Sequence, residues 1–140
     1  MGILKQCDTE SKNEINWEKA ACEILLLHID EQNNDCKKKL SDLVAAIFSA
    51  NLLEQAENFQ TRFLNVDNKI TLLKNEMAQL DKWLCCNVQG TETKNALLKL
   101  SQDLFVKAKN AEQSFIDLKA KFFDYLMSIT GILGQSKRRI

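Results

Sequence analysis

The sequence contains no proline and only four glycines among its 140 residues. Because these two residue types mark most turns, their scarcity argues against many short strands and favours a few long helices. The charge lacks an excess of either sign, with 19 basic and 19 acidic residues, so nucleic acid is not an expected partner. No apolar run approaches the ~18 residues of a membrane-spanning helix, and the N-terminus lacks the apolar core of a secretory signal. The sequence therefore predicts an all-α protein.

Residues for metal or acid–base chemistry are equally scarce. The five cysteines form an odd set without spaced pairs, which favours a reducing, cytoplasmic setting over a disulfide framework. The single histidine, His28, is expected in or at the boundary of the core. We therefore predict no enzyme, no catalytic residue, no cofactor, no metal site and no small-molecule substrate. A redox or metal-sensing bundle that uses the adjacent Cys85 and Cys86 stays as an alternative hypothesis, and no role is predicted for Cys7.

A capping box, Ser11-Lys12-Asn13-Glu14, predicts where the first helix begins. Residues 1–10 are then a flexible N-terminus, and the helix spans about 12–32. Its apolar residues cover an unusually wide surface, which indicates a core helix with neighbours on two sides. They are Ile15, Trp17, Ala20, Ala21, Cys22, Ile24, Leu25, Leu26, Leu27 and Ile29.

The run Gln32-Asn33-Asn34-Asp35 is a candidate turn, because Asn and Asp side chains compete for backbone groups. Two observations favour a continuous helix instead. The charges on both sides of the run have the wrong sign for helix ends, and a heptad continues through it with Asn33 as its one polar member. We favour the turn, since a helix from 12 to 86 would be roughly 110 Å long.

Two further helices are predicted, at about 36–86 and 93–133, joined at Gly90 and closed by Gly131 and Gly134. Each carries apolar residues three and four positions apart, as helices packed against other helices do. The first set is Phe59, Phe63, Val66, Ile70, Leu73, Met77, Leu80 and Leu84. The second is Leu97, Ser101, Leu104, Ala108, Ala111, Phe115, Leu118, Phe122, Tyr125, Ile129 and Ile132.

The short connection makes these two helices an antiparallel coiled-coil hairpin, with Phe59 near Phe122. The first helix is expected to pack on the open end of this hairpin, which gives an elongated three-helix bundle over 11–134. A change in apolar phase near Ser49-Ala50-Asn51 indicates a rotated face or a bend. Residues 135–140 form a basic tail.

A short first helix cannot reach the apolar residues near the tip of the hairpin. We therefore expect a partner-binding patch at Leu64, Leu72, Leu98 and Phe105. The predicted function is a non-catalytic adaptor or scaffold that binds another copy of itself or another helical protein. A membrane-active helical protein, using the apolar residues around Phe122 to Ile129 and the basic tail, is the alternative from a different class.

Overall fold

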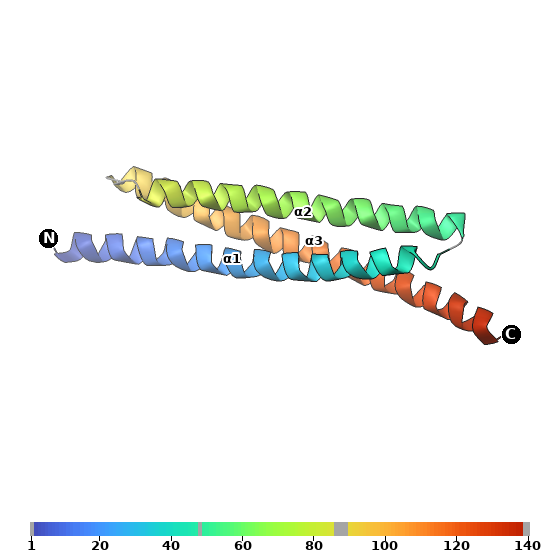
Figure 1. The fold of residues 1–140 in the computed structure, drawn as a ribbon. Coiled ribbons are helices and arrows are strands. Elements are labelled where there is room, and N and C mark those ends of the chain that lie inside the picture. Colours follow the sequence, from blue (N-terminus) through green and yellow to red (C-terminus); the bar gives the residue numbers. More distant parts are fainter. Residues whose placement is uncertain (1, 48, 86–89, 139–140) are drawn as a thin grey trace.

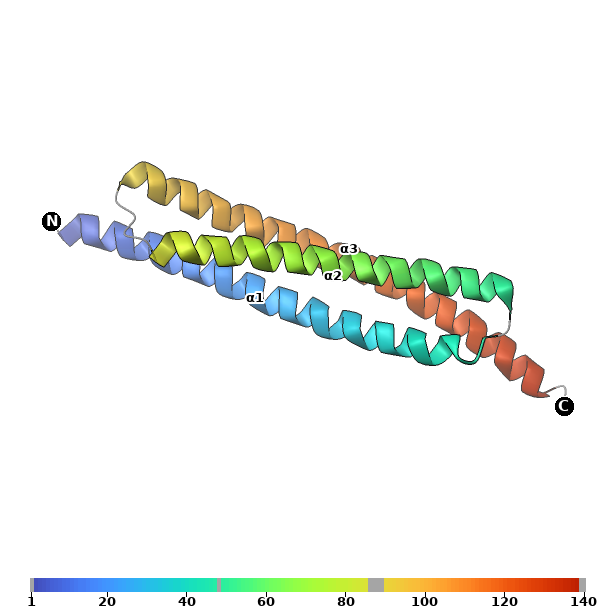
Figure 2. The ribbon, with the colours of Figure 1, turned by 45° about the horizontal axis from the view of Figure 1, so that its top comes forward.

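The computed structural model describes residues 2–47, 49–85 and 90–138, with side chains described for 14–47, 49–85, 90 and 92–130. It contains three helices, α1 (Gly2–Val44), α2 (Ala50–Cys85) and α3 (Thr91–Arg138), and no strand in those ranges. The helices lie side by side along the long axis of the molecule, and α2 runs opposite to α1 and α3 (Figures 1 and 2). Each helix packs against the other two. The all-α prediction is confirmed.

The first helix is about twice as long as predicted. It begins at Gly2, so the helix bounds of 12–32 are wrong, and residues 2–10 of the predicted flexible N-terminus are helical. With 43 residues, α1 is roughly 65 Å long. It lies along the bundle as far as the end where α2 finishes, because Lys19 pairs with Asp81 and Ser101 Oγ donates to Glu18 Oε2 at 3.0 Å. It does not stop at the open end of the other two helices.

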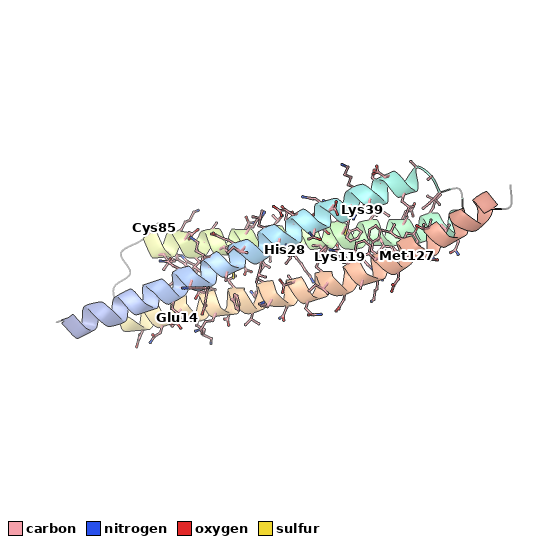
Figure 3. All side chains as sticks on the ribbon, turned by 90° about the horizontal axis from the view of Figure 1, so that it is seen from below. Glu14, His28, Lys39, Cys85, Lys119 and Met127 are labelled. Atoms are coloured by element: carbon pink, nitrogen blue, oxygen red, sulfur yellow. The ribbon has the colours of Figure 1, made fainter. Side chains whose placement is uncertain are left out.

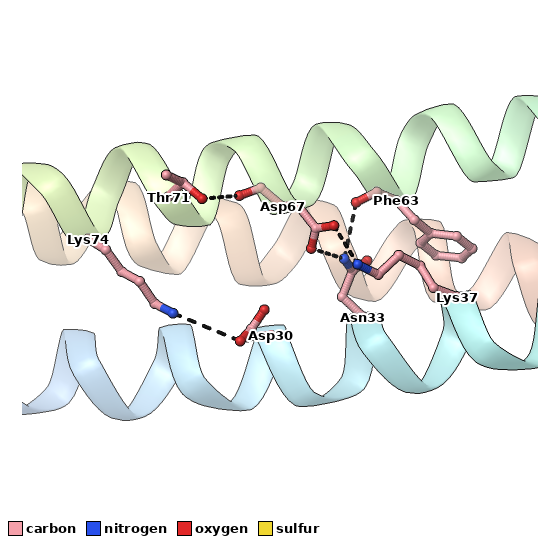
Figure 4. A network of polar contacts seen from close by, with 7 residues as sticks. All are labelled: Asp30, Asn33, Lys37, Phe63, Asp67, Thr71 and Lys74. Carbon is pink, nitrogen blue, oxygen red and sulfur yellow. Dashed lines mark hydrogen bonds and ion pairs between the residues drawn. The ribbon is translucent and has the colours of Figure 1, made fainter.

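The predicted turn at 32–35 is also wrong, and Figure 4 shows why. Asn33 is completely buried, and its Nδ2 donates to Phe63 O at 3.1 Å and to Asp67 Oδ1 at 2.8 Å. Lys37 Nζ lies 2.5 Å from Asp67 Oδ2, and Lys74 Nζ lies 3.9 Å from Asp30 Oδ2. Within the run that resembles a turn, Asn33 is thus bonded to α2, Gln32 accepts from Lys119 of α3, and Asp35 pairs with Lys39 one helical turn later. The helix continues through all four residues.

The connection between α1 and α2 falls where the apolar phase changes. Ala46 N donates to Leu43 O at 2.9 Å, and Ile47 N donates to Val44 O at 3.3 Å. α2 then begins at Ala50, after Ser49, whose carbonyl accepts from Leu53 N at 3.0 Å. The phase change marks a turn, whereas the sequence predicted a rotated face or a bend inside one helix over 36–86, so those helix bounds are wrong.

The apolar sets of α2 and α3 form the core with the inward face of α1. Most of their members are buried, and Phe59, Val66, Leu84 and Ala111 are partly buried against the others. The predicted neighbours Phe59 and Phe122 have ring centroids 5.4 Å apart, and Phe63 lies edge-on to Phe122 at 5.0 Å. Tyr125 Oη donates to Leu52 O at 2.7 Å, which ties α3 to the start of α2. Ile132 lies outside the described side chains.

The predicted start of α3 agrees with the structure, and its predicted end does not. Gly90 has a φ of +108°, in the region that favours glycine, and Lys94 N donates to its carbonyl oxygen at 3.2 Å. At the other end the helix passes through Gly131 and Gly134 to Arg138, so the prediction that these glycines close it is wrong. The tail side chains over 135–140 lie outside those described.

Candidate interaction surface

The four residues predicted to bind a partner have two kinds of surroundings. Leu64 and Leu72 are exposed on α2, by 49% and 61%. Leu98 and Phe105 on α3 are partly buried and pack against the core. Phe105 also lines a groove with α1, because α1 reaches the part of the bundle that was expected to be uncovered. The premise that the first helix cannot reach the tip of the hairpin is therefore wrong.

A different set of apolar side chains is exposed on α1. We define the outer stripe as Trp17, Ala20, Ile24 and Leu27, which are spaced three, four and three residues apart. Trp17 is 76% exposed, Ile24 68% and Leu27 56%. This spacing places the four side chains along one side of the helix. The four residues have the spacing of a face that contacts another helix, yet Trp17, Ile24 and Leu27 are each more than half exposed.

The other side of the same segment faces the bundle. We define the inner seam as Ile15, Cys22, Leu26, Ile29, Asn33, Cys36 and Leu40, all of which are buried. α1 therefore has two apolar sides, as its wide apolar surface predicted. α2 and α3 cover the inner seam, and the outer stripe stays exposed.

Beside the outer stripe, an open groove of about 860 Å³ lies between α1 and α3. Ala20, Ala21 and Leu25 contribute apolar surface from α1, and Phe105 contributes it from α3. Lys109 Nζ lies 5.9 Å from the centroid of the Phe105 ring and 3.7 Å from Glu112 Oε1. The remaining lining residues are Asn16, Trp17 and Ile24. A groove with small residues along one helix and an aromatic ring on the other suits the side chains of a further helix.

Ion pairs join the helices on the other two sides of the bundle. Between α1 and α2, Lys19 pairs with Asp81 and Lys37 with Asp67. Between α2 and α3, Lys107 Nζ lies 3.3 Å from Glu76 Oε2. The groove beside the outer stripe, at about 860 Å³, is larger than the groove lined by Leu27 and Met77, at about 330 Å³, and the groove lined by Phe59 and Tyr125, at about 400 Å³.

The residues considered for redox, metal or acid–base chemistry are dispersed. Cys22 and Cys36 are buried and Cys85 is exposed near one end of the bundle (Figure 3). His28 is exposed on α1, so its predicted place in or at the boundary of the core is wrong. Within the described residues, no three His, Cys, Asp or Glu side chains gather as a metal site. The side chains of Cys7 and Cys86 lie outside the described set.

The region considered for membrane insertion is divided between the core and the surface of α3. Phe122, Tyr125 and Ile129 are buried, whereas Phe123 and Met127 are exposed on the outside of α3. The rings and cations of this region interact with one another, since Lys39 Nζ lies 5.4 Å and Lys119 Nζ 5.5 Å from the Phe123 centroid. Among the described helices, none has the length and apolar character needed to cross a membrane.

No protein-family model, no curated protein and no solved structure matches this chain. Function must therefore be argued from the surface that the three helices leave open.

Proposed function

We propose that this chain is a non-catalytic helical-bundle protein that mediates protein–protein assembly through the outer stripe of α1 and the groove beside it. In this proposal α2 and α3 are the antiparallel coiled-coil hairpin that their apolar spacing predicts, and α1 completes the bundle. The proposed partner is helical, and the setting is the reducing, intracellular one that the cysteine content favours.

The exposure of Trp17, Ile24 and Leu27 is the single observation that carries the proposal. Scattered surface apolar residues are common in soluble proteins. Here the three side chains share one side of one helix and expose apolar surface on the order of 400 Å². Trp17 and Ile24 line the groove with Phe105, and Leu27 lines a neighbouring groove with Met77 of α2. An apolar patch of that size is as large as a monomer usually exposes and is often functional.

The proposal keeps one residue of the patch expected from the sequence and moves the rest of the site. Phe105 lines the groove and remains in the proposed surface. Leu98 lies two helical turns before Phe105, on the same side of α3, because the two residues are seven positions apart. Leu64 and Leu72 lie on α2 and form a competing candidate surface. The two candidates can be separated by substitutions on exposed side chains, which leave the core intact.

A photo-crosslinking amino acid at residue 24 tests this function in cells that make the protein. We expect crosslinks to a helical protein or to a second copy, and we expect Trp17→Glu in the same chain to reduce them at least tenfold. The matched control places the crosslinker at Lys38, which is exposed on the same side of α1 beyond the outer stripe.

The competing surface is tested in the same way. Leu64→Asp combined with Leu72→Asp leaves the crosslinks at residue 24 unchanged if the outer stripe is the contact surface. Loss of crosslinking in the α2 variant, with retention in Trp17→Glu, contradicts the proposal and favours the α2 surface.

A further inference from the structure

The outer stripe has an internal symmetry that bears on what covers it. Ala20 and Ala21 lie at its centre, Trp17 lies three residues before them, and Ile24 lies three residues after them. When two copies of such a segment lie antiparallel about the alanines, each Trp17 comes opposite Ile24 of the other copy. The small alanines allow the two helices to approach closely at the centre.

The groove accommodates this arrangement. Ser101 contacts Glu18, and Lys119 Nζ donates to Gln32 Oε1 at 2.5 Å, so residues of α3 lie level with α1 residues roughly 85 positions earlier. Phe105 is therefore level with the central alanines, and it lines the groove with them. The small alanine side chains leave apolar contact area unfilled, and the Phe105 ring can supply that contact to α1 of the second copy.

The polar side chains on either side of the outer stripe favour an antiparallel orientation. Glu14 precedes the outer stripe and His28 follows it, and both are exposed on α1 (Figure 3). They are fourteen residues apart, two heptads, and so share one side of the helix. In the antiparallel pair Glu14 comes opposite Leu27, so its carboxylate lies one residue from His28 and within reach of an imidazole N–H of the other copy. A parallel pair in register places carboxylate beside carboxylate.

From these observations we infer that the partner is a second copy of this chain, bound antiparallel through α1 about Ala20 and Ala21. The inference rests on the proposed function and names its partner. The outer stripe, the alanines, Leu25 and Phe105 of two copies together bury on the order of 1,200 Å², which is the lower bound for specific protein interfaces. The dimer is thus expected to be reversible and concentration-dependent.

Charge exchange in sedimentation experiments tests the orientation. The wild-type chain should sediment as a monomer–dimer equilibrium. Glu14→Lys alone and His28→Glu alone should each weaken the dimer about fivefold to tenfold, and the double variant should recover most of the wild-type affinity. Lys38→Glu is the matched control, because it changes a charge on the same side of α1 beyond the stripe, and it should leave the dimer unchanged.

Circular dichroism separates loss of association from loss of folding, since every variant should keep the wild-type helical signal. Two results overturn the inference: a wild-type chain that is monomeric at all concentrations, and a double variant no better than the singles. If the chain is monomeric while crosslinks from residue 24 to another protein still depend on Trp17, the proposed function stands and the self-association fails. If the crosslinks are also absent, both fail.

Discussion

The inner seam and the outer stripe of α1 consist of similar apolar residues at similar spacing. They lie side by side over the three helical turns from Trp17 to Leu27. Cys22, Leu26 and Ile29 are each 1% exposed, whereas Ile24 and Leu27 are 68% and 56% exposed. The inner seam continues through Asn33 and Cys36 to Leu40, and α2 and α3 cover it. The outer stripe ends after Leu27, because Glu31 holds the next position in its spacing. The inner seam holds α1 against the bundle, and the outer stripe is the surface that we propose for association.

The strongest test of this difference changes adjacent leucines. Leu26→Ala should lower the free energy of unfolding by about 2–4 kcal/mol, because it removes buried methyl groups and leaves a cavity. Leu27→Ala, one residue away, should change it by no more than about 0.5 kcal/mol in the monomer. Urea unfolding at low protein concentration measures both values. Equal losses in the two variants would mean that the two sides of α1 do not differ as described.

A smaller effect is expected from the polar member of the inner seam. Asn33→Ala should lower the free energy of unfolding by about 1–3 kcal/mol, since it loses two hydrogen bonds and leaves a void. Asn33→Leu should recover that loss, because Asn33 Oδ1 is buried and accepts no hydrogen bond from the described residues. A leucine variant less stable than the alanine variant would show that the amide is required for packing as well as for pairing. The comparison uses urea unfolding of the two variants and the wild type.

The smallest effect concerns alkaline pH. Burial, with a smaller contribution from Glu18 and Glu23, raises the pKa of the Cys22 thiol from about 9.0 to about 11. The folded chain therefore retains a proton that the unfolded chain releases, so stability from the neutral thiol is full below pH 9 and is lost as the pH rises toward 11. The raised pKa values of Lys19, paired with Asp81, and of buried Tyr125 act in the same direction.

Unfolding measured at a series of pH values checks this dependence. Cys22→Ala should flatten the decline between pH 9 and 11. A decline that is just as steep without Cys22 would remove this thiol from the explanation.

Much of the fold could be predicted from the sequence, because the apolar spacing of α2 and α3 is long and unbroken. Those residues are buried, and the expected contact between Phe59 and Phe122 is present. The length of α1 could not be predicted, because the polar residues around Asn33 are stabilised by Phe63 and Asp67 on another helix. Local preference for a turn was outweighed by contacts between residues thirty or more positions apart.

The candidate surface was missed for a related reason. The sequence shows that α1 is apolar on a wide surface, but Trp17 and Ile24 resemble Cys22 and Leu26 in spacing and character. The distinguishing signal is how far each set continues: one reaches Leu40, and the other ends at Leu27. A short first helix would leave the hairpin tip uncovered, so the sequence placed the surface there, at residues that include Leu64 and Leu72. The observed α1 reaches that end of the bundle.

The fluorescence of Trp17 tests the central claim most directly. In a Trp83→Phe chain, Trp17 is the one remaining tryptophan, and it is 76% exposed in the single chain. Its emission should move to shorter wavelength and become resistant to acrylamide quenching as the protein concentration rises, because the second copy covers it. The Trp17→Phe chain, which reports on Trp83, should show neither change. Trp17 emission that stays at long wavelength and equally quenchable at every concentration would contradict the outer stripe as the self-association surface.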